Sequence, residues 1–203
     1  MFKFLASIIY KFLNFFDKIF KILFKRSFLI WINNFLEKDA YKYISHTSLN
    51  KKIRLFNPNY LTNWLYDDFF LKEPETIEWI DNFHKNSDKI TFWDIGSNLG
   101  IYSVYAAIKH KNIEIISFEP STNNLRILSR NVFINGLQDK IKILQLPLSD
   151  KDLGFAELKE KNFGEGESNN TFDYNIDFEG KEIKFENSYN FLGTSLNYLV
   201  DNK

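Results

Sequence analysis

The chain has 203 residues, 44% of them hydrophobic, which is enough apolar material for a packed core and excludes a disordered chain. The formal net charge is zero, so there is no electrostatic argument for a nucleic-acid partner. There is no cysteine, which excludes disulfides, thiolate chemistry and cysteine-bound zinc, and the three histidines lack metal-ligand spacing. We therefore expect a cytoplasmic protein with one ordinary domain, an extension and no metal site.

Residues 1–39 are predicted to form an amphipathic helical segment. Its polar residues recur every three or four positions, and apolar residues fill the rest of the helical wheel. The polar stripe consists of Lys3, Ser7, Lys11, Asn14, Lys18, Lys21 and Lys25. Lysines interrupt every apolar stretch well before the roughly 20 residues that span a bilayer, and no signal-peptide core is present.

Two interpretations of this segment remain open. Residues 1–25 can form an interfacial helix, with lysines facing anionic headgroups and phenylalanines in the acyl boundary. Arg26 and Trp31 favour this peripheral membrane contact. Alternatively, the helix docks on its own domain or on another subunit.

Residues 40–88 are expected to form a cap region before the main domain. Residues 40–72 look irregular, apart from a short strand at residues 52–56 that is followed by an Asn-Pro-Asn turn. A helix is expected over residues 73–83, because Pro74 suits its first turn and the acidic residues there face the positive end of the helix dipole.

From residue 89 to residue 203, strands alternate with helices. Strands are expected at residues 90–95, 113–118 and 141–146, and helices at residues 101–110 and 122–134. Strands that are apolar on both faces and alternate with helices indicate an α/β fold whose parallel sheet is covered on both sides.

After residue 150 the pattern becomes that of antiparallel structure. Residues 155–159 indicate a strand, residues 164–170 a polar loop and residues 192–200 a short helix. Alternating apolar and polar residues from 172 to 185, with a turn at 179–181, predict a C-terminal β-hairpin. This hairpin either shapes a binding site or merely covers an edge of the sheet.

An acidic residue and a glycine-rich loop follow the first strand of this domain. Asp94 ends the strand, and Gly96 and Gly100 enclose Ser97 and Asn98 before the next helix begins. Glycines let the backbone approach a ligand, and the amides at a helix N-terminus bind an anion. A dinucleotide fingerprint would have glycine at position 98, and Asp94 would repel phosphates, so a nicotinamide-dependent oxidoreductase is disfavoured. S-adenosylmethionine fits better, because it has a carboxylate for the helix terminus and two cationic groups that favour a nearby acid.

Glu119 ends the second strand, 23 residues after Gly96. A carboxylate at this position can accept hydrogen bonds from both ribose hydroxyls of a nucleoside. Taken alone, it is also an acid that caps the helix at residue 122. The two motifs together, each after a strand and before a helix, favour a cofactor site.

Four segments resemble the FkbM-type methyltransferases of class I: residues 92–105 (FWDIGSNLGIYSVY), 117–120 (SFEP), 131–137 (NVFINGL) and 146–150 (LPLSD). Residues 73–80 are similar to the helix that those proteins place before the first strand. The resemblance covers roughly residues 40–200. It implies a Rossmann-like fold and methyl transfer from S-adenosylmethionine, usually to a hydroxyl of a glycan, a lipid-linked sugar or a small metabolite.

The resemblance also implies which residues bind the cofactor. The implied residues are Asp94, Gly96, Ser97, Asn98, Gly100, Glu119, Ser149 and Asp150. The loop residues would line the methionine end, the glutamate would hold the ribose, and the last two would lie near the adenine. Glu73 has two interpretations, as a contact for the cofactor's ammonium or as a helix-start acid.

The catalytic residues are not identified. His46, His84 and His110 qualify as a general base by residue type alone, and His110 at a helix end suits a bond to free carbonyls. In the family, a fourth strand with an acidic motif follows a segment like residues 194–199, and this chain stops at Lys203. Only the 3-2-1 half of the sheet is therefore expected, as in a truncated gene product. The alternative function is a catalytically inactive fragment that binds a membrane surface.

Overall fold

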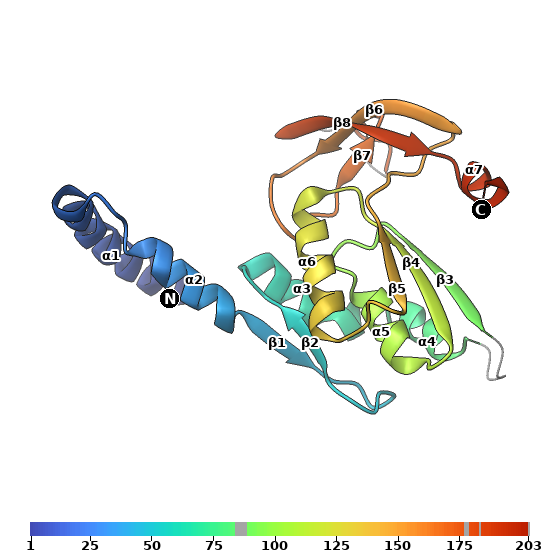
Figure 1. The fold of residues 1–203 in the computed structure, drawn as a ribbon, viewed down its shortest axis with the longest axis horizontal. Helices are drawn as coiled ribbons and strands as arrows, with labels where there is room; N and C mark the ends of the chain where they lie inside the picture. The colour runs from blue at the N-terminus through green and yellow to red at the C-terminus, as the bar shows by residue number, and fades with distance from the viewer. Residues whose placement is uncertain (84–88, 177–178, 183, 203) are drawn as a thin grey trace. The chain divides into compact units, whose positions relative to one another are not determined.

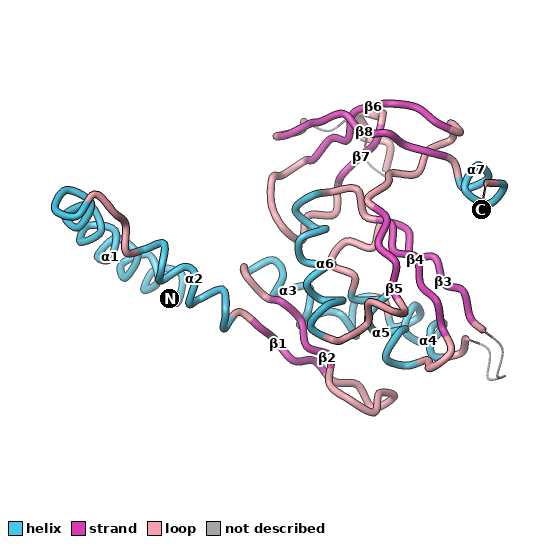
Figure 2. Tube along the Cα trace, viewed as in Figure 1, coloured by secondary structure: helices cyan, strands magenta, loops and turns pink. Residues whose placement is uncertain are grey.

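The computed structural model describes residues 1–83, 89–176, 179–182 and 184–202, and these form two compact units, residues 1–41 and 42–203. Figure 1 labels the elements in chain order, and Figure 2 separates helices, strands and loops by colour.

The first unit is a pair of helices. The expected helical segment is confirmed, but it is divided into α1 (Phe2–Phe24) and α2 (Leu29–Asp39). The break begins at Lys25, which adopts a left-handed conformation with φ of 55°. The two helices lie side by side as a helical hairpin (Figure 1), and the rings of Phe20 and Phe28 meet across the turn at 5.6 Å. Among the described residues, no helix is both long enough and apolar enough to span a membrane.

The cap region contains more regular structure than expected. The predicted strand is β2 (Ile53–Phe56), and it pairs with β1 (Tyr41–Ile44) in a two-stranded sheet. The irregular reading of residues 40–72 is wrong at α3 (Tyr60–Lys72), which begins with a capping box between Asn59 and Thr62. The expected helix after it is α4 (Pro74–Asp81).

A three-stranded parallel sheet forms the centre of the second unit. Its strands are β3 (Ile90–Ile95), β4 (Ile113–Phe118) and β5 (Ile141–Leu144), in that order, connected by α5 (Ile101–Lys109) and α6 (Thr122–Ile134). Ile90 lies opposite Ile113, and Ile115 lies opposite Ile141. This arrangement confirms the predicted α/β fold and the 3-2-1 half of a Rossmann-like sheet.

The helices cover one face of this sheet. Phe92 and Ile115 are buried there, with Phe92 in ring contact with Trp79 of α4. On the opposite face, Ile95 is 53% exposed and Leu144 is 37% exposed. The expected cover on both sides is therefore present on only one side within the described part of the chain.

Asn131 of α6 and the C-cap residue of that helix, Asn135, form hydrogen bonds with the backbone of β2. Asn135 accepts a hydrogen bond from the backbone N–H of Arg54 at 3.1 Å and donates to the carbonyl of Arg54 at 2.7 Å. One turn earlier, the fully buried Asn131 accepts from the N–H of Phe56 at 2.7 Å and donates to the carbonyl of Leu99 at 2.9 Å. Asn131 thereby ties the cap region to the glycine loop.

The C-terminal part forms an antiparallel sheet beyond the carboxyl ends of the parallel strands (Figure 1). It consists of β6 (Leu153–Glu160), β7 (Asn170–Phe172) and β8 (Asn187–Thr194) in the order β7-β6-β8. A backbone bond from Ser149 N–H to Thr194 C=O, 2.8 Å long, joins it to the segment that follows β5.

Two expectations for this region need correction. The predicted hairpin at residues 172–185 retains a single antiparallel bridge between Ile176 and Glu182, and residues 177, 178 and 183 lie outside the described residues. The long antiparallel pair is instead β6 with β8, which pair from Leu153 opposite Thr194 to Glu160 opposite Asn187. The helix expected at residues 192–200 is reduced to α7 (Leu196–Asp201), which Ser195 caps through its side chain.

Candidate functional site

The glycine loop between β3 and α5 is held by the end of β4. The backbone N–H groups of Gly96 and Ser97 both donate to the carbonyl of Phe118, at 3.0 and 2.9 Å. The loop then turns through three residues with positive φ, which are Gly96 (73°), Asn98 (51°) and Gly100 (71°). At Gly100 a Cβ atom would lie 2.1 Å from the end of the Leu128 side chain, so another residue would have to displace this buried leucine in addition to adopting a positive φ.

Asp94 lies behind this loop, in a network of hydroxyl groups. Its carboxylate accepts a hydrogen bond from the Ser103 hydroxyl at 2.5 Å, and the hydroxyls of Ser103 and Ser117 are 2.6 Å apart. Burial raises the pKa of Asp94 above its usual value, and the bonds from Ser103 only partly oppose this. The side chain of Asp94 lines none of the cavities described below.

Glu119 is almost completely buried, with 4% of the residue exposed. One carboxylate oxygen accepts from the N–H of Asn98 at 2.7 Å, and the other accepts from the N–H of Ser121 at 2.9 Å. Burial raises the pKa of Glu119 to about 7, although these two amide bonds act in the opposite direction. Glu119 therefore connects the glycine loop with the start of α6.

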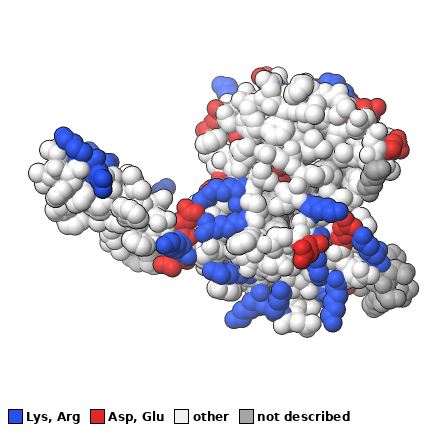
Figure 3. All heavy atoms as spheres, viewed as in Figure 1, with Lys and Arg blue, Asp and Glu red and all other residues white. Residues whose placement is uncertain are grey.

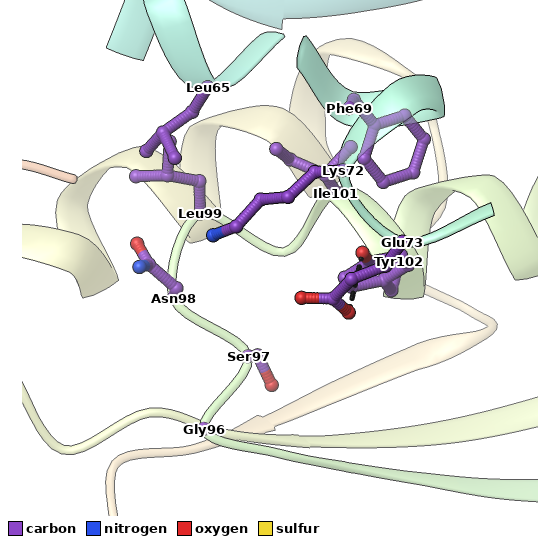
Figure 4. A pocket seen from close by; sticks show the side chains of 10 residues that line it. All are labelled: Leu65, Phe69, Lys72, Glu73, Gly96, Ser97, Asn98, Leu99, Ile101 and Tyr102. Atoms are coloured by element: carbon purple, nitrogen blue, oxygen red, sulfur yellow. Dashed lines mark hydrogen bonds between the residues drawn. The ribbon is translucent and has the colours of Figure 1, made fainter. Parts of the chain in front are cut away.

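A cavity of about 180 Å³ lies beside the glycine loop, and we call it the Glu73 cavity. Figure 4 shows its lining, which comes from α3, the α3–α4 junction, the loop and the start of α5. The lining residues are Leu65, Phe69, Lys72, Glu73, Gly96, Ser97, Asn98, Leu99, Ile101 and Tyr102. The side-chain oxygen of Asn98 is buried and has no hydrogen-bond partner among the described residues, so it can accept a hydrogen bond from a ligand.

Two adjacent residues bring opposite charges to the Glu73 cavity. Lys72 and Glu73 both project into the space next to the loop (Figure 4). Tyr102 donates a hydrogen bond to the Glu73 carboxylate at 2.9 Å, and burial together with Glu73 raises the pKa of this tyrosine. Glu73 makes no capping bond to the backbone of α4. Its position in the cavity is what the ligand-contact interpretation of this residue requires.

A second cavity, of about 200 Å³, lies at the carboxyl ends of β3 and β4, and we call it the Pro120 cavity. It is lined by Ile95, Gly96, Phe118, Pro120, Leu146, Pro147, Leu148, Leu158, Asn170 and Phe172. Its side chains are apolar except that of Asn170, whose buried oxygen also lacks a hydrogen-bond partner within the described residues. Gly96 lines both cavities, and nothing lies within 4 Å of the position that a Cβ atom would occupy there.

The structure thus brings together only some of the predicted site residues. Gly96, Ser97 and Asn98 line the Glu73 cavity, while Gly100 packs against α6. Ser149 and Asp150 line a neighbouring hollow with Ser195, Leu196 and Asn197, and Leu148 lines both this hollow and the Pro120 cavity.

The histidines lie elsewhere. His46 bonds to the Ser48 hydroxyl at 2.8 Å, and His110 bonds to the carbonyl of Ile80 at 2.8 Å. Neither of them lines either cavity. His84 lies outside the described residues.

Several lining residues were not foreseen from the sequence. Lys72 belongs to the last turn of α3, a helix that was not expected. The capping box between Asn59 and Thr62 at the start of α3 is the sequence signal that could have revealed it. Asn170 and Phe172 come from a strand of the antiparallel sheet, and no local motif marks them as site residues.

No protein-family model matches the chain. Over 56 residues it is 38% identical to the methyltransferase sdnD of Sordaria araneosa, a match that covers 28% of this chain and 22% of that protein. The chain thus matches about a fifth of the length of this curated relative.

Solved structures give distant likenesses. A SAM-dependent methyltransferase from Agrobacterium tumefaciens has a TM-score of 0.40 at 14% identity, over 52% of this chain and 32% of that one. A domain described as StiE O-MT has a TM-score of 0.37 at 16% identity, over 42% of this chain and 31% of that one. The parallel sheet and the loop geometry above define the fold independently of these values.

Proposed function

We propose that the chain binds S-adenosylmethionine across the Glu73 and Pro120 cavities and takes part in methyl transfer to a hydroxyl group. The observation that carries this proposal is the meeting of the two cavities at Gly96, one with side chains of opposite charge and one whose side chains are apolar except for Asn170. Each cavity alone is smaller than the roughly 300–1,000 Å³ of an ordinary ligand pocket, and the two together reach that range. A ligand with a zwitterionic end and a flat apolar end matches this division.

The Glu73 cavity suits an amino-acid group. The carboxylate of Glu73 and the unpartnered oxygen of Asn98 are acceptors for an ammonium, and Lys72 is a cation for a carboxylate. The N-terminus of α5 begins at the same loop and adds a positive helix dipole. We propose that these groups hold the methionine part of the cofactor and fix its orientation.

The Pro120 cavity suits an adenine ring. Phe118, Pro120 and Leu146 provide apolar surface, and the unpartnered oxygen of Asn170 is an acceptor for an exocyclic amino group. This assignment replaces Ser149 and Asp150 by the residues immediately before them. Glu119 lines neither cavity, and its carboxylate already bonds the amides of Asn98 and Ser121 and the side chain of Asn124, so its proposed contact with the ribose rests on its sequence position alone.

When bound, S-adenosylmethionine supplies a methyl group on a sulfonium that is already activated for displacement. The protein then contributes mainly alignment, which is worth on the order of 7–11 kcal/mol in well-oriented reactions. A hydroxyl acceptor also needs a base. Neither His46 nor His110 lines a cavity, so the structure identifies no base among them. The proposed acceptor, a hydroxyl of a glycan, a lipid-linked sugar or a small metabolite, rests on the sequence resemblance alone.

Calorimetric titration with S-adenosylhomocysteine tests the cofactor site. We expect binding by the wild-type chain and a roughly tenfold to hundredfold loss in Glu73→Gln, since hydrogen bonds to charged groups contribute about 1.5–3 kcal/mol. Glu75→Gln is the matched control, because Glu75 lies in the first turn of α4 and does not line the cavity. A folded wild-type chain that does not bind, or equal affinities in the two variants, would rule out this site.

A further inference from the structure

Residues 1–36 form a surface that combines cations with exposed apolar side chains. They contain six basic residues, Lys3, Lys11, Lys18, Lys21, Lys25 and Arg26, and one acidic residue, Asp17. The face drawn in Figure 3 shows this part as mostly uncharged, with blue cationic groups towards the turn of the helical hairpin.

The one acid of this segment is removed from the surface. Asp17 is fully buried, and its carboxylate accepts from the Ser27 hydroxyl at 2.8 Å and from the N–H groups of Phe28 and Leu29 at 2.8 and 3.3 Å. Lys21 forms an ion pair with it at 2.7 Å. Asp17 thus caps α2 from the neighbouring helix, fixes the turn of the hairpin and leaves the outer surface of residues 1–36 without an exposed acid.

Two sets of apolar residues on α1 bear on its contacts, and further phenylalanines outside both sets, Phe16 and Phe24 among them, are also exposed. One set faces α2 and includes Ala6, Ile9 and Leu13, which line a cleft with Leu29 and Ile32. The other set is 40–73% exposed and recurs every three or four positions, as expected for one face of a helix. Its members are Phe4, Leu5, Ile8, Phe12, Phe15, Ile19, Ile22 and Leu23.

Lysines border this exposed face, and a basic hollow lies at the turn. Lys11 and Lys18 each lie four residues before an exposed member of the face, Phe15 and Ile22, so each pair is adjacent on the helix. The hollow at the turn is lined by Lys21, Lys25, Arg26, Ser27, Ile30 and Trp31, and Trp31 is 64% exposed. Cations beside an apolar face, with a tryptophan at the same level, are the features of a helix in a lipid headgroup layer.

We propose that the helical hairpin docks on an anionic membrane surface through residues 1–36, with the exposed face of α1 in the acyl boundary and the hollow at the turn against lipid phosphates. Glu37 and Asp39, at the end of α2, lie outside this surface. Charge complementarity selects this occupant over a second copy of the chain, because two such faces would bring like charges together. This proposal does not depend on the proposed methyltransferase function, because the membrane contact involves only the helical hairpin.

Vesicle flotation of the full chain tests the proposal. We expect binding to phosphatidylcholine vesicles that contain phosphatidylglycerol, weaker binding at higher salt, and little binding to phosphatidylcholine alone. A blue shift of the Trp31 emission, absent in Trp31→Phe, should accompany binding. Equal partition onto neutral and anionic vesicles, or no partition onto either, would overturn the proposal.

Two triple variants with the same net charge distinguish binding through the hairpin surface from a general effect of the protein's net charge. Lys11→Glu, Lys18→Glu and Lys25→Glu together should reduce partition by at least about tenfold. Lys51→Glu, Lys111→Glu and Lys161→Glu, at exposed positions of the second unit, should leave it unchanged. Equal effects would contradict the assignment to the hairpin.

An apolar variant tests insertion. Phe15→Ser with Ile19→Ser should also release the chain from vesicles, while its far-UV circular dichroism and mass in solution stay those of the wild type. A wild-type dimer that this variant converts to a monomer, without vesicle binding by either, would overturn the proposal in favour of a second copy. The salt dependence of vesicle binding by the wild-type chain tests the proposal without any variant, so the test holds even where a variant does not fold.

Discussion

The Glu119 carboxylate accepts the backbone N–H of Asn98 at 2.7 Å, and this bond joins the residue after β4 to the loop after β3. Two parallel strands that are adjacent in the sheet therefore share one buried acid at their carboxyl ends. The bond also explains why Asn98 can keep its left-handed conformation, since its amide is fixed by a charged partner when Glu119 is ionised.

The raised pKa of Glu119 predicts a pH dependence of stability. Because its pKa rises from 4.5 to about 7 on folding, the folded state binds more protons than the unfolded state between these values. Glu119 therefore contributes most to the free energy of unfolding below pH 4.5. This contribution, on the order of 3 kcal/mol, is lost as the pH rises to about 7. Urea unfolding of the wild type and Glu119→Gln between pH 5 and 8 measures it. The difference between the two proteins should change across this range, and parallel curves would contradict the assignment.

Gly100→Ala should destabilise the protein strongly. A left-handed alanine costs about 1–2 kcal/mol, and the Cβ atom 2.1 Å from Leu128 adds an overpacking cost of about 1–3 kcal/mol. Gly136→Ala is the control, since its φ of 66° is similar and nothing lies within 4 Å. Thermal unfolding should show the larger loss for Gly100→Ala, with partial recovery in the double variant with Leu128→Ala.

Gly96→Ala should separate stability from ligand binding. Its φ of 73° predicts a strain of about 1–2 kcal/mol, and the new methyl group would enter the space where the two cavities meet. Gly180→Ala has the same kind of strain at φ of 79° and lies outside both cavities. We expect similar melting temperatures for the two variants and loss of S-adenosylhomocysteine binding only in Gly96→Ala. Retained affinity in Gly96→Ala would argue against a ligand that crosses this point.

Asn131→Ala should cost several kcal/mol of unfolding free energy. It leaves the buried N–H of Phe56 and the carbonyl of Leu99 without their partner, at about 1–3 kcal/mol each. Asn135→Ala should cost less, because Asn135 is only half-buried and water can replace it. Denaturant unfolding of both variants measures the difference. A loss below about 1 kcal/mol in Asn131→Ala would contradict the bridging role.

The central βα repeat could be predicted almost to the residue, because each strand and helix carries its own period and its own end signals. β3, β4 and α6 have the expected bounds. The position of the glycine loop between β3 and α5 was also predicted correctly. These features depend on nearby residues only.

The parts that failed depend on distant residues. The buried residues of α3, Thr62, Tyr66 and Phe69, lie on one face of the helix. Its exposed side also carries large apolar residues, such as Tyr60 and Leu71, so the separation of polar from apolar residues that would reveal a helix is weak. The turn between α1 and α2 is held by Asp17, which lies ten residues before its hydrogen-bond partner Ser27. Asn170 reaches the Pro120 cavity through a sheet whose pairing no local pattern specifies.

The uncovered face of the parallel sheet has a practical consequence. Trp93, Ile95, Ile116 and Leu144 remain partly exposed there in the folded chain. Environment-sensitive dyes that fluoresce on apolar surfaces would bind this face before any unfolding occurs. A dye-based melting curve would start from a high signal and understate the transition, so circular dichroism is the sounder measure of thermal unfolding for this protein.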